Sequence, residues 1–390
     1  MLRSLYSGIS GLRSHQTMLD VTGNNIANVN TAGFKSSTVQ FQDTLSQVTK
    51  SGSAAQAAVG GTNPAQVGLG VQVAGISTNF AQGSAQATGR STDMMISGDG
   101  FFVTSKGGQQ LFARAGSFDF DTQGRLVSPD GALLQGWAAV NGQVNTGGAL
   151  GNLAISKAMT TPSAATTSTV LGGNLPSDAA AGTKLVRDVQ VFDASGAKRN
   201  VSLEFTRTAA GWDVAGTDGG TTGNTSLTFN PDGTPAGGGV MALGGITVDL
   251  ANVTGYANLS TVAVTSSNGN AAGTLESFAL GADGTLTGTF SNGENAVIGR
   301  VALANFTNPG GLEKDGNSSY RATASSGGAV IGAPGQGGLG ELAGGYVEMS
   351  NVDLSQEFTN LIVAQRGFQA NARIITTSDE VLQELTQLKR

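Results

Sequence analysis

The apolar positions at the two ends of the chain follow a helical repeat, whereas those between the ends alternate as they do in β-strands. Near the N-terminus, apolar residues recur every seven positions, with others between them. Spacing that alternates three and four residues is typical of a coiled-coil seam, so the pattern predicts a helix over about residues 3–27. The members of this predicted N-terminal seam are Leu5, Ile9, Leu12, Leu19 and Ile26.

The C-terminal segment shows the same repeat and predicts a second helix, from Leu354 to about Lys389. Asp353 can cap its first turn, with Gln356 as a capping-box partner. A second apolar row runs beside the first, at Ile374, Val381 and Leu388. The predicted C-terminal seam comprises Leu354, Leu361, Phe368, Ile375 and Leu382.

Between the ends, alternating apolar residues and repeated Asp-Gly pairs predict short strands joined by tight turns. Residues 50–70 are rich in Ser, Ala and Gly and predict a connector. Two polar segments, 160–169 and 265–273, look like crossings between one domain and another inserted in it. A Gly-rich linker is predicted over 325–345.

The predicted fold is therefore mainly β with α-helical termini: terminal coiled-coil helices and two antiparallel β domains, the outer one inserted in the inner. The predicted boundaries are 1–70 for the N-terminal helix and connector, 71–157 and 273–345 for the inner β domain, 158–272 for the outer one, and 346–390 for the C-terminal helix. Since chain termini often lie together, we expect the two helices to be neighbours.

The composition excludes several classes of function. The formal net charge of −6 argues against nucleic acid and against an acidic membrane surface. No cysteine is present, so no disulfide or thiolate metal site can form. No apolar run approaches the roughly 20 residues of a membrane span, and the N-terminus lacks the apolar core of a secretory signal. We expect no membrane insertion, and export, if it occurs, without signal cleavage.

Two motifs imitate ligand sites. Asp119, Asp121, Gln123 and Asp130 match positions of a calcium loop, but the last position should be Glu and the flanks predict strands, which favours a β-hairpin turn. The segment 335–340, "GQGGLG", matches a dinucleotide fingerprint but lacks the strand and helix that must flank it, so a flexible linker is predicted.

No residue set predicts catalysis or a cofactor. His15 is the single histidine, without a second metal ligand or a nucleophile nearby in sequence, and a solvated helix face is the prediction for it. The acidic residues are scattered. Two carboxylates of a glycosidase leave no sequence signature, so spacing alone does not exclude that class.

Seams at both ends predict assembly. The C-terminal helix carries one more apolar row than a two-helix pair can cover, so the uncovered row needs other subunits. Head-to-tail contacts that do not close grow a helical filament. With linkers isolating both helices from the β region, we expect the two ends to be disordered until assembly.

Several long segments resemble the family of bacterial flagellar rod and hook proteins. Residues 24–35, "NNIANVNTAGFK", resemble its N-terminal signature, and residues 98–103 and 112–137 its first β domain. Residues 305–320 and 345–388 are similar to the hook members in particular, and the resemblance does not extend to 158–272. Ala113 stands where the family often has Thr.

The resemblance implies a structural subunit of a curved, hollow flagellar hook, in which the terminal helices line a channel and the β domains lie outside. It implies as partners further copies of the chain, the rod, the hook cap, the hook–filament junction proteins and the flagellar type III export apparatus, and an extracellular location. "NNIANVNTAGFK" would end the channel-lining helix, with Gly33 supplying an unusual backbone angle and Asn28 or Asn30 bonding local backbone.

Two alternatives differ from this interpretation. A distal rod protein of the same family usually lacks a large insert, whereas this chain has one. A secreted β-rich adhesin or glycan-processing enzyme would have no use for seams at both ends.

Overall fold

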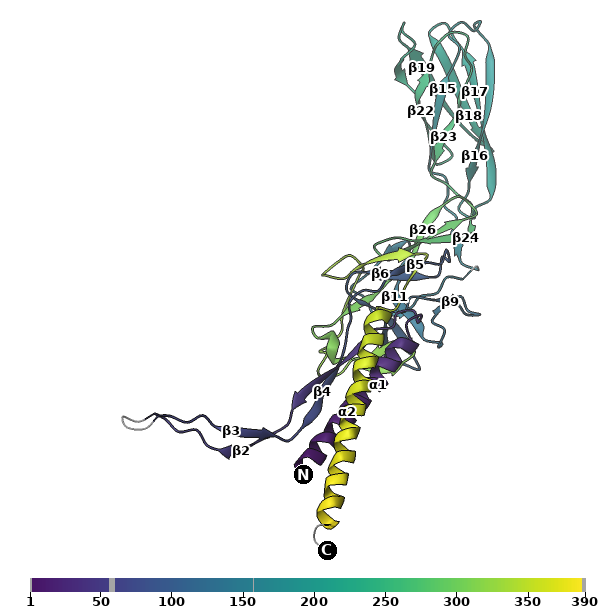
Figure 1. Cartoon of the computed structure of the whole chain (residues 1–390). Coiled ribbons are helices and arrows are strands. Elements are labelled where there is room, and N and C mark those ends of the chain that lie inside the picture. Colours follow the sequence, from purple (N-terminus) through teal and green to yellow (C-terminus); the bar gives the residue numbers. More distant parts are fainter. Residues whose placement is uncertain (1, 56–59, 157, 388–390) are drawn as a thin grey trace. The chain divides into compact units, whose positions relative to one another are not determined.

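A computed structural model describes residues 2–55, 60–156 and 158–387. It confirms the predicted fold class, since β-strands fill the middle of the chain and a helix lies at each end (Figure 1). Helix α1 spans Leu2–Ala27 and α2 spans Leu354–Gln387. Asp353 caps α2 as predicted: its Oδ1 accepts hydrogen bonds from the backbone N–H groups of Ser355 and Gln356, at 2.8 and 3.3 Å.

The chain divides into two compact units. The first contains residues 1–155, 279–287 and 297–390, and the second contains 156–278 and 288–296. The second unit overlaps the insert predicted at 158–272 but continues to residue 278, because Thr160 and Thr161 pair with Thr274 and Gly273. Strands β24 (Gly273–Leu280), β25 (Thr285–Phe290) and β26 (Asn295–Val301) are divided between the units.

The first unit is built on antiparallel pairs in which β11 pairs with β7, β7 with β8, β8 with β29, and β29 with β28. Strand β27 pairs with both β7 and β30. The bounds of these strands are β7 Phe101–Lys106, β8 Gln109–Ala113, β11 Leu133–Val140, β27 Leu303–Asn305, β28 Glu313–Gly316, β29 Ser319–Arg321 and β30 Val330–Gly332. Shorter elements complete the unit: β9 Asp119–Phe120, β10 Leu126–Val127, β12 Gln143–Val144, β13 Gly151–Asn152 and a 3-10 turn at Pro309–Gly311.

Aromatic side chains form the core of this sheet. Phe101 lies edge-on to both Phe306 and Tyr320, and Phe112 packs edge-on to Phe306 with ring centroids 4.8 Å apart. Such pairs favour an offset or edge-to-face arrangement because the ring edge is positive and the face negative. Trp137 and several alanines close the cluster.

The predicted connector at 50–70 is instead part of a long antiparallel ribbon. Strands β1 (Ser37–Asp43) and β4 (Val71–Thr78) form its base, and β2 (Ser46–Lys50) and β3 (Ala65–Gly68) continue it. An isolated bridge between Ser53 and Thr62 extends the pairing. Residues 56–59 of the predicted connector lie outside the described residues. Composition suggested a linker because the strands are exposed on both faces and lack an apolar alternation.

The predicted linker at 325–345 also contains strands. β31 (Glu341–Gly344) pairs with β6 (Met94–Ser97), and β32 (Tyr346–Glu348) pairs with β5 (Ala85–Ala87). Within it, "GQGGLG" is packed rather than flexible: Leu339 is buried and the N–H of Gly340 donates to the carbonyl of Asp99. The prediction of a flexible linker is therefore wrong. The strand β31 follows the motif, at the place where a dinucleotide fingerprint needs a helix.

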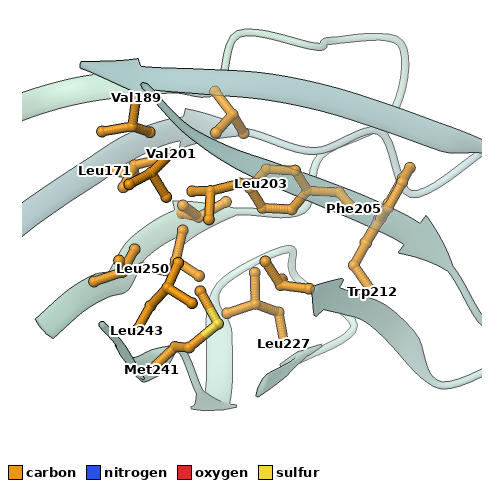
Figure 2. Close-up of a cluster of buried hydrophobic side chains, with 14 of the residues drawn as sticks. Leu171, Val189, Val201, Leu203, Phe205, Trp212, Leu227, Met241, Leu243 and Leu250 are labelled. Carbon is orange, nitrogen blue, oxygen red and sulfur yellow. The ribbon is translucent and has the colours of Figure 1, made fainter. Parts of the chain in front are cut away.

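The second unit is a sandwich of two sheets (Figure 2). A five-stranded sheet has the order β16-β17-β18-β19-β20 and a four-stranded sheet the order β21-β22-β15-β23. Alternate residues of both sheets point inward, where Leu203, Phe205 and Trp212 are almost fully buried. The strands are β14 Thr160–Thr161, β15 Ser168–Asn174, β16 Lys184–Phe192, β17 Lys198–Arg207, β18 Gly211–Asp218, β19 Thr221–Phe229, β20 Pro235–Gly238, β21 Val240–Leu243, β22 Ile246–Thr254 and β23 Ala263–Ser267.

One pairing in this unit departs from the predicted antiparallel pattern. β15 and β22 run parallel, with Ser168 opposite Thr247. Parallel neighbours need a long crossover, and the whole five-stranded sheet lies between them in the sequence. Period-two alternation reports which face of a strand is buried and does not report its direction, so the sequence pattern could not detect this pair.

Candidate functional site: the terminal helix pair and its joint

Helices α1 and α2 lie side by side and antiparallel (Figure 1). Small residues bring them together: a Cβ on Gly8 would lie 3.3 Å from Ile375, and one on Gly11 only 2.5 Å from Oδ1 of Asn371. Residues later in α1 contact residues earlier in α2, so the two helices run in opposite directions. Glycine lowers helix propensity, so this close approach must compensate for the cost of glycine in α1.

Most members of the predicted seams are partly buried in the structure, but not all of them. Leu5, Leu12, Leu19 and Ile26 of α1 are partly buried, as are Leu361, Ile375 and Leu382 of α2. The exceptions are Ile9, Leu354 and Phe368, which are 38–40% exposed. The assembly role of all these residues stays a prediction.

Helix α2 also exposes apolar side chains that the seam did not include. Two of the predicted second row, Ile374 and Val381, are among them, and Leu388 lies outside the described residues. Four others were missed because they do not fall on the heptad. These exposed side chains, which we call the open rows of α2, are Phe358, Ile362, Val363, Ile374, Val381 and Leu385, at 43–53% exposed.

His15 lies in a junction rather than on a solvated face. Its ring faces Gly367 of α2, and its centroid is 5.8 Å from that of Phe41 in β1. Nδ1 is buried and accepts no hydrogen bond from the described part of the chain. The prediction was wrong because the ribbon covers this side of α1, and nothing in the local sequence shows that the ribbon folds back.

The ribbon is fastened to α1 at three levels. Asn25 bonds Ser37, His15 packs on Phe41, and the Oγ of Ser10 accepts from the N–H of Val71 at 3.2 Å. The helix is therefore not isolated from the β region by a linker, contrary to the prediction. Whether the far ends of the helices order only on assembly stays a prediction.

The chain leaves α1 through the predicted turn. Gly33 has φ +69°, and a Cβ there would lie 2.6 Å from Cα of Ala115, so both conformation and space require glycine. The amide of Asn28 donates to the carbonyl of Asn24 at 2.9 Å. Asn30 is exposed, and its side chain makes no hydrogen bond to any residue that the structure describes. The role of these three in redirecting the chain stays a prediction.

Sequence reasoning missed a buried polar residue just before this turn, Asn25 in the last turn of α1. It is 1% exposed, and its side chain exchanges two hydrogen bonds with the backbone of Ser37, at 2.8 and 3.0 Å. Its Nδ2 also donates to Oε1 of Glu357 in α2, at 3.1 Å. Four asparagines in seven residues were a signal, but sequence does not say which one is buried.

A buried ionic cluster lies next to this turn. Lys35 and Glu348 are both fully buried, with Nζ 2.5 Å from Oε1, and Nη1 of Arg114 is 3.4 Å from Oε2 of the same carboxylate. Burial lowers the pKa of Lys35 and of Arg114 from their ordinary values, although Glu348 opposes both shifts. Arg114 also lies over the ring of Phe101, 5.3 Å from its centroid. We call Lys35, Arg114 and Glu348 the terminal joint.

The calcium-like loop is a hairpin turn, as predicted. Asp119 and Phe120 pair with Val127 and Leu126 across the turn, and the carboxylate of Asp121 accepts from Arg125. Within the described ranges no three acidic or histidine side chains gather as metal ligands, and no helix is long and apolar enough to span a membrane.

Three family models match parts of this chain. "Flagella basal body rod protein" matches residues 5–35, "Flagellar hook protein FlgE/F/G D1 domain" matches 95–171, and "Flagellar basal body rod FlgEFG protein C-terminal" matches 343–388. The first and last cover much of the two terminal helices, and the middle one covers part of the aromatic-cored sheet. These segments define a flagellar axial protein of the rod and hook class.

Full-length relatives narrow the class. Flagellar hook protein FlgE of Borreliella burgdorferi is 38% identical and that of Treponema pallidum 37%, each aligned over the whole of both chains. The fold is similar to the crystal structure of Helicobacter pylori flagellar hook protein FlgE2, with a TM-score of 0.50 over 68% of this chain and all of that one, at 14% identity. The chain belongs to the flagellar hook protein family and is a structural subunit of the hook.

The rod alternative is not favoured. The basal-body rod protein FlgG of Bacillus subtilis aligns over the whole of both chains at 34% identity. The higher identity to hook proteins favours the hook.

Proposed function

We propose that this hook subunit polymerises head-to-tail into a curved, hollow helical tube. The tube would act as a flexible joint that transmits motor torque from the basal-body rod to the filament. The terminal helices would line the channel, the first unit's sheets would surround them, and the second unit would form the outermost layer. Membership of the hook family supports this proposal, as does the surface of α2.

The open rows of α2 are the observation that carries the proposal. Within its own chain α2 has α1 as a neighbour on one side only, and six large apolar side chains remain 43–53% exposed. Water-exposed apolar rows of this extent mark interaction surfaces. Burying one such side chain stabilises an interface by about 1.5–3 kcal/mol. Several buried at every subunit contact are sufficient to drive polymer growth.

The members of the two predicted seams would make two kinds of contact. Its partly buried members, such as Leu361 and Ile375, would hold α1 to α2 within a subunit. Its exposed members, Ile9, Leu354 and Phe368, would join the open rows in contacts between subunits. The turn at Asn28, Asn30 and Gly33 would direct the chain from the channel wall to the outer layers.

The partners would be further copies of the chain, the rod, the hook cap and the hook–filament junction proteins. The flagellar type III export apparatus would deliver the subunit to an extracellular position on the basal body. A structural role accounts for the whole chain without a catalytic residue, so we infer that the protein is not an enzyme.

Electron microscopy of an α2 variant tests the proposal. Ile362→Asp places a carboxylate in an open row, which costs the lost burial plus several kcal/mol if the charge is buried unpaired. We expect a folded protein that forms no tubes, and non-motile cells. The matched control is Thr359→Asp, which adds the same charge to an exposed polar position of the same helix and should leave assembly intact. Normal tubes from Ile362→Asp would refute the open rows as a polymer interface.

A further inference from the structure

The carboxylate of Glu348 joins three segments that are far apart in the sequence. Its Oε1 accepts from Nζ of Lys35, in the segment that leaves α1, and from the backbone N–H of Gly83, at 2.8 Å. Its Oε2 accepts from Arg114, which directly follows strand β8. Its own carbonyl accepts from the N–H of Gly33, at 2.8 Å.

The two cations of the terminal joint are tied to the β region in turn. Nζ of Lys35 donates to the carbonyl of Ala81 at 2.7 Å, and Nη1 of Arg114 donates to that of Gly98 at 2.9 Å. Directional bonds therefore run from the β region, through both cations, to Glu348. Lys35 lies eight residues after the end of α1, and Glu348 lies six residues before the start of α2.

A second set of bonds repeats the pattern closer to the helices. Asn351 accepts from the N–H of Ser36 at 2.9 Å and donates to the carbonyls of Asn79 and Ala81. Beyond it, Asn25 connects Ser37 to Glu357. The helix pair is thus held at successive levels by polar contacts of fixed direction.

A gain in folding stability does not account well for a buried ionic cluster of this kind. Desolvating three ionic groups offsets most of their attraction, and an apolar replacement of similar volume is often neutral or stabilising. Apolar contacts, however, tolerate sliding, whereas short ionic hydrogen bonds fix both distance and direction. A buried ionic cluster between a helix base and a sheet is therefore suited to defining an angle.

The length of α2 magnifies any change in that angle. Its 34 residues extend about 50 Å at 1.5 Å per residue. A rotation of roughly 10° at the joint would move the far end by about 9 Å, close to the width of a helix. Neighbouring open rows could not meet in the same register after such a displacement.

We propose that the terminal joint of Lys35, Arg114 and Glu348 fixes the direction in which the helix pair leaves the first unit's sheet, and that this direction sets the curvature of the polymer. The second half of this inference, which concerns curvature, rests on the proposed function. Its first half concerns a single chain and can be tested without a polymer. Glu348 is the positioning residue because both ion pairs of the joint meet at its carboxylate.

The test replaces the joint by apolar residues of similar size, in the triple variant Lys35→Met, Arg114→Met, Glu348→Leu. The chain has no cysteine, so spin labels can be attached only at introduced sites, and we choose Gln110→Cys in β8 and Gln365→Cys in α2, both exposed. Electron paramagnetic resonance then measures the distance between the two labels within one chain. The same unlabelled variant is assembled and its tubes are imaged for curvature.

We expect the triple variant to keep its circular dichroism spectrum and to lose the single narrow label distance of the parent. Its tubes should show a wide range of curvatures. The single variant Glu348→Gln should melt at a lower temperature than the triple, because it leaves two buried cations without a counter-charge. The control Arg90→Met with Asp119→Leu removes an exposed ion pair of the same unit and should change neither the distance nor the curvature.

A narrow, unchanged distance in the triple variant would overturn the proposal, whether or not tubes form. A broadened distance with tubes of normal curvature would overturn its second half. A broadened distance without tubes would support the first half of the proposal, that the joint fixes the direction of the helix pair. The failure of assembly would then be attributed to the altered helix direction, because the open rows of α2 are unchanged. Failure of the parent chain to form tubes would count against the proposed function instead.

Discussion

The imidazole of His15 in α1 lies against the Cα of Gly367 in α2. A Cβ added to Gly367 would lie 2.5 Å from Nε2 of His15, well inside the closest approach of two such atoms. The contact joins the two ends of the chain across more than 350 intervening residues. It also explains a glycine in the middle of a long helix, where alanine would otherwise be favoured.

Gly367→Ala should therefore separate the helices. Overpacking of this kind costs about 1–3 kcal/mol, more than the 0.5–1 kcal/mol that alanine contributes to helix propensity. We expect faster hydrogen exchange of the α1 amides that face α2. The matched control is Gly23→Ala in α1, where no atom lies within 4 Å of the added Cβ and slower exchange is expected. Equal responses of the two variants would show that the helices do not approach through Gly367.

Phe368→Asp should abolish tube formation. The side chain is 38% exposed within the chain, so its loss leaves the monomer's sheets intact. In a polymer it would lose about 1.5–3 kcal/mol of burial, and its unpaired carboxylate would cost several more. We expect an unchanged β-sheet circular dichroism signal, no tubes under the electron microscope and non-motile cells. Gln365→Asp, at an exposed polar position, should be milder; wild-type tubes from Phe368→Asp would contradict the seam.

Limited trypsin digestion should separate the anchored from the free parts of the helices. In the isolated monomer we expect early cleavage after Arg3 and Arg373, which are exposed and lie toward the far end of the helix pair. Lys35 should resist, since its side chain is fully buried and ion-paired. Mass spectrometry of the fragments distinguishes these sites. Early cleavage at Lys35, or resistance of both arginines in a proven monomer, would contradict the expected order of fraying.

Ser318→Gly should stabilise the first unit. Asn317 and Ser318 form the two-residue turn between β28 and β29, with φ of +49° and +58°. Asparagine tolerates this conformation, whereas serine is strained there, so glycine should add up to about 1 kcal/mol of stability in urea unfolding. Ser319→Gly, one residue later and inside β29, removes a buried strand side chain and should have the opposite sign. The same sign for both would show that the turn is not strained.

The second unit should lose stability in acid through Asp193. The hydroxyl of Ser195, followed by the backbone N–H of Ala197, holds the pKa of this carboxyl below its ordinary value. A lowered folded pKa contributes stability that is present above the unfolded value of about 3.9 and is lost as pH falls through the folded one. Urea unfolding, followed by Trp212 fluorescence in a Trp137→Phe background, should therefore weaken below about pH 4.

Two variants isolate that effect. Asp193→Asn removes the titrating group, and Ser195→Ala removes the largest cause of the shift, so both should flatten the fall in stability toward acid. Carboxyl NMR of Ser195→Ala should show the pKa of Asp193 moving upward toward its ordinary value. An unchanged acid limb in both variants would show that other groups govern it.

Local pattern was sufficient for the elements at the chain ends. The heptad spacing of Leu5, Leu12 and Leu19 predicted α1, and Asp353 marked the start of α2, because helix periodicity and capping depend on residues within a few positions of each other. The same is true of the hairpin at Asp121 and of glycine at position 33. Long motifs such as "NNIANVNTAGFK" carried the family, since they are specific over many residues.

What the sequence could not provide were the contacts between distant segments. It did not show that the ribbon folds back on His15, that Asn25 rather than Asn28 is buried, or that β15 and β22 run parallel. Lys35, Arg114 and Glu348 read separately as ordinary charged residues, because the sequence records the charge and not the desolvation or the partner. Burial away from water and the pairing of opposite charges arise only when residues more than 200 positions apart are brought together. The tertiary structure alone decides both.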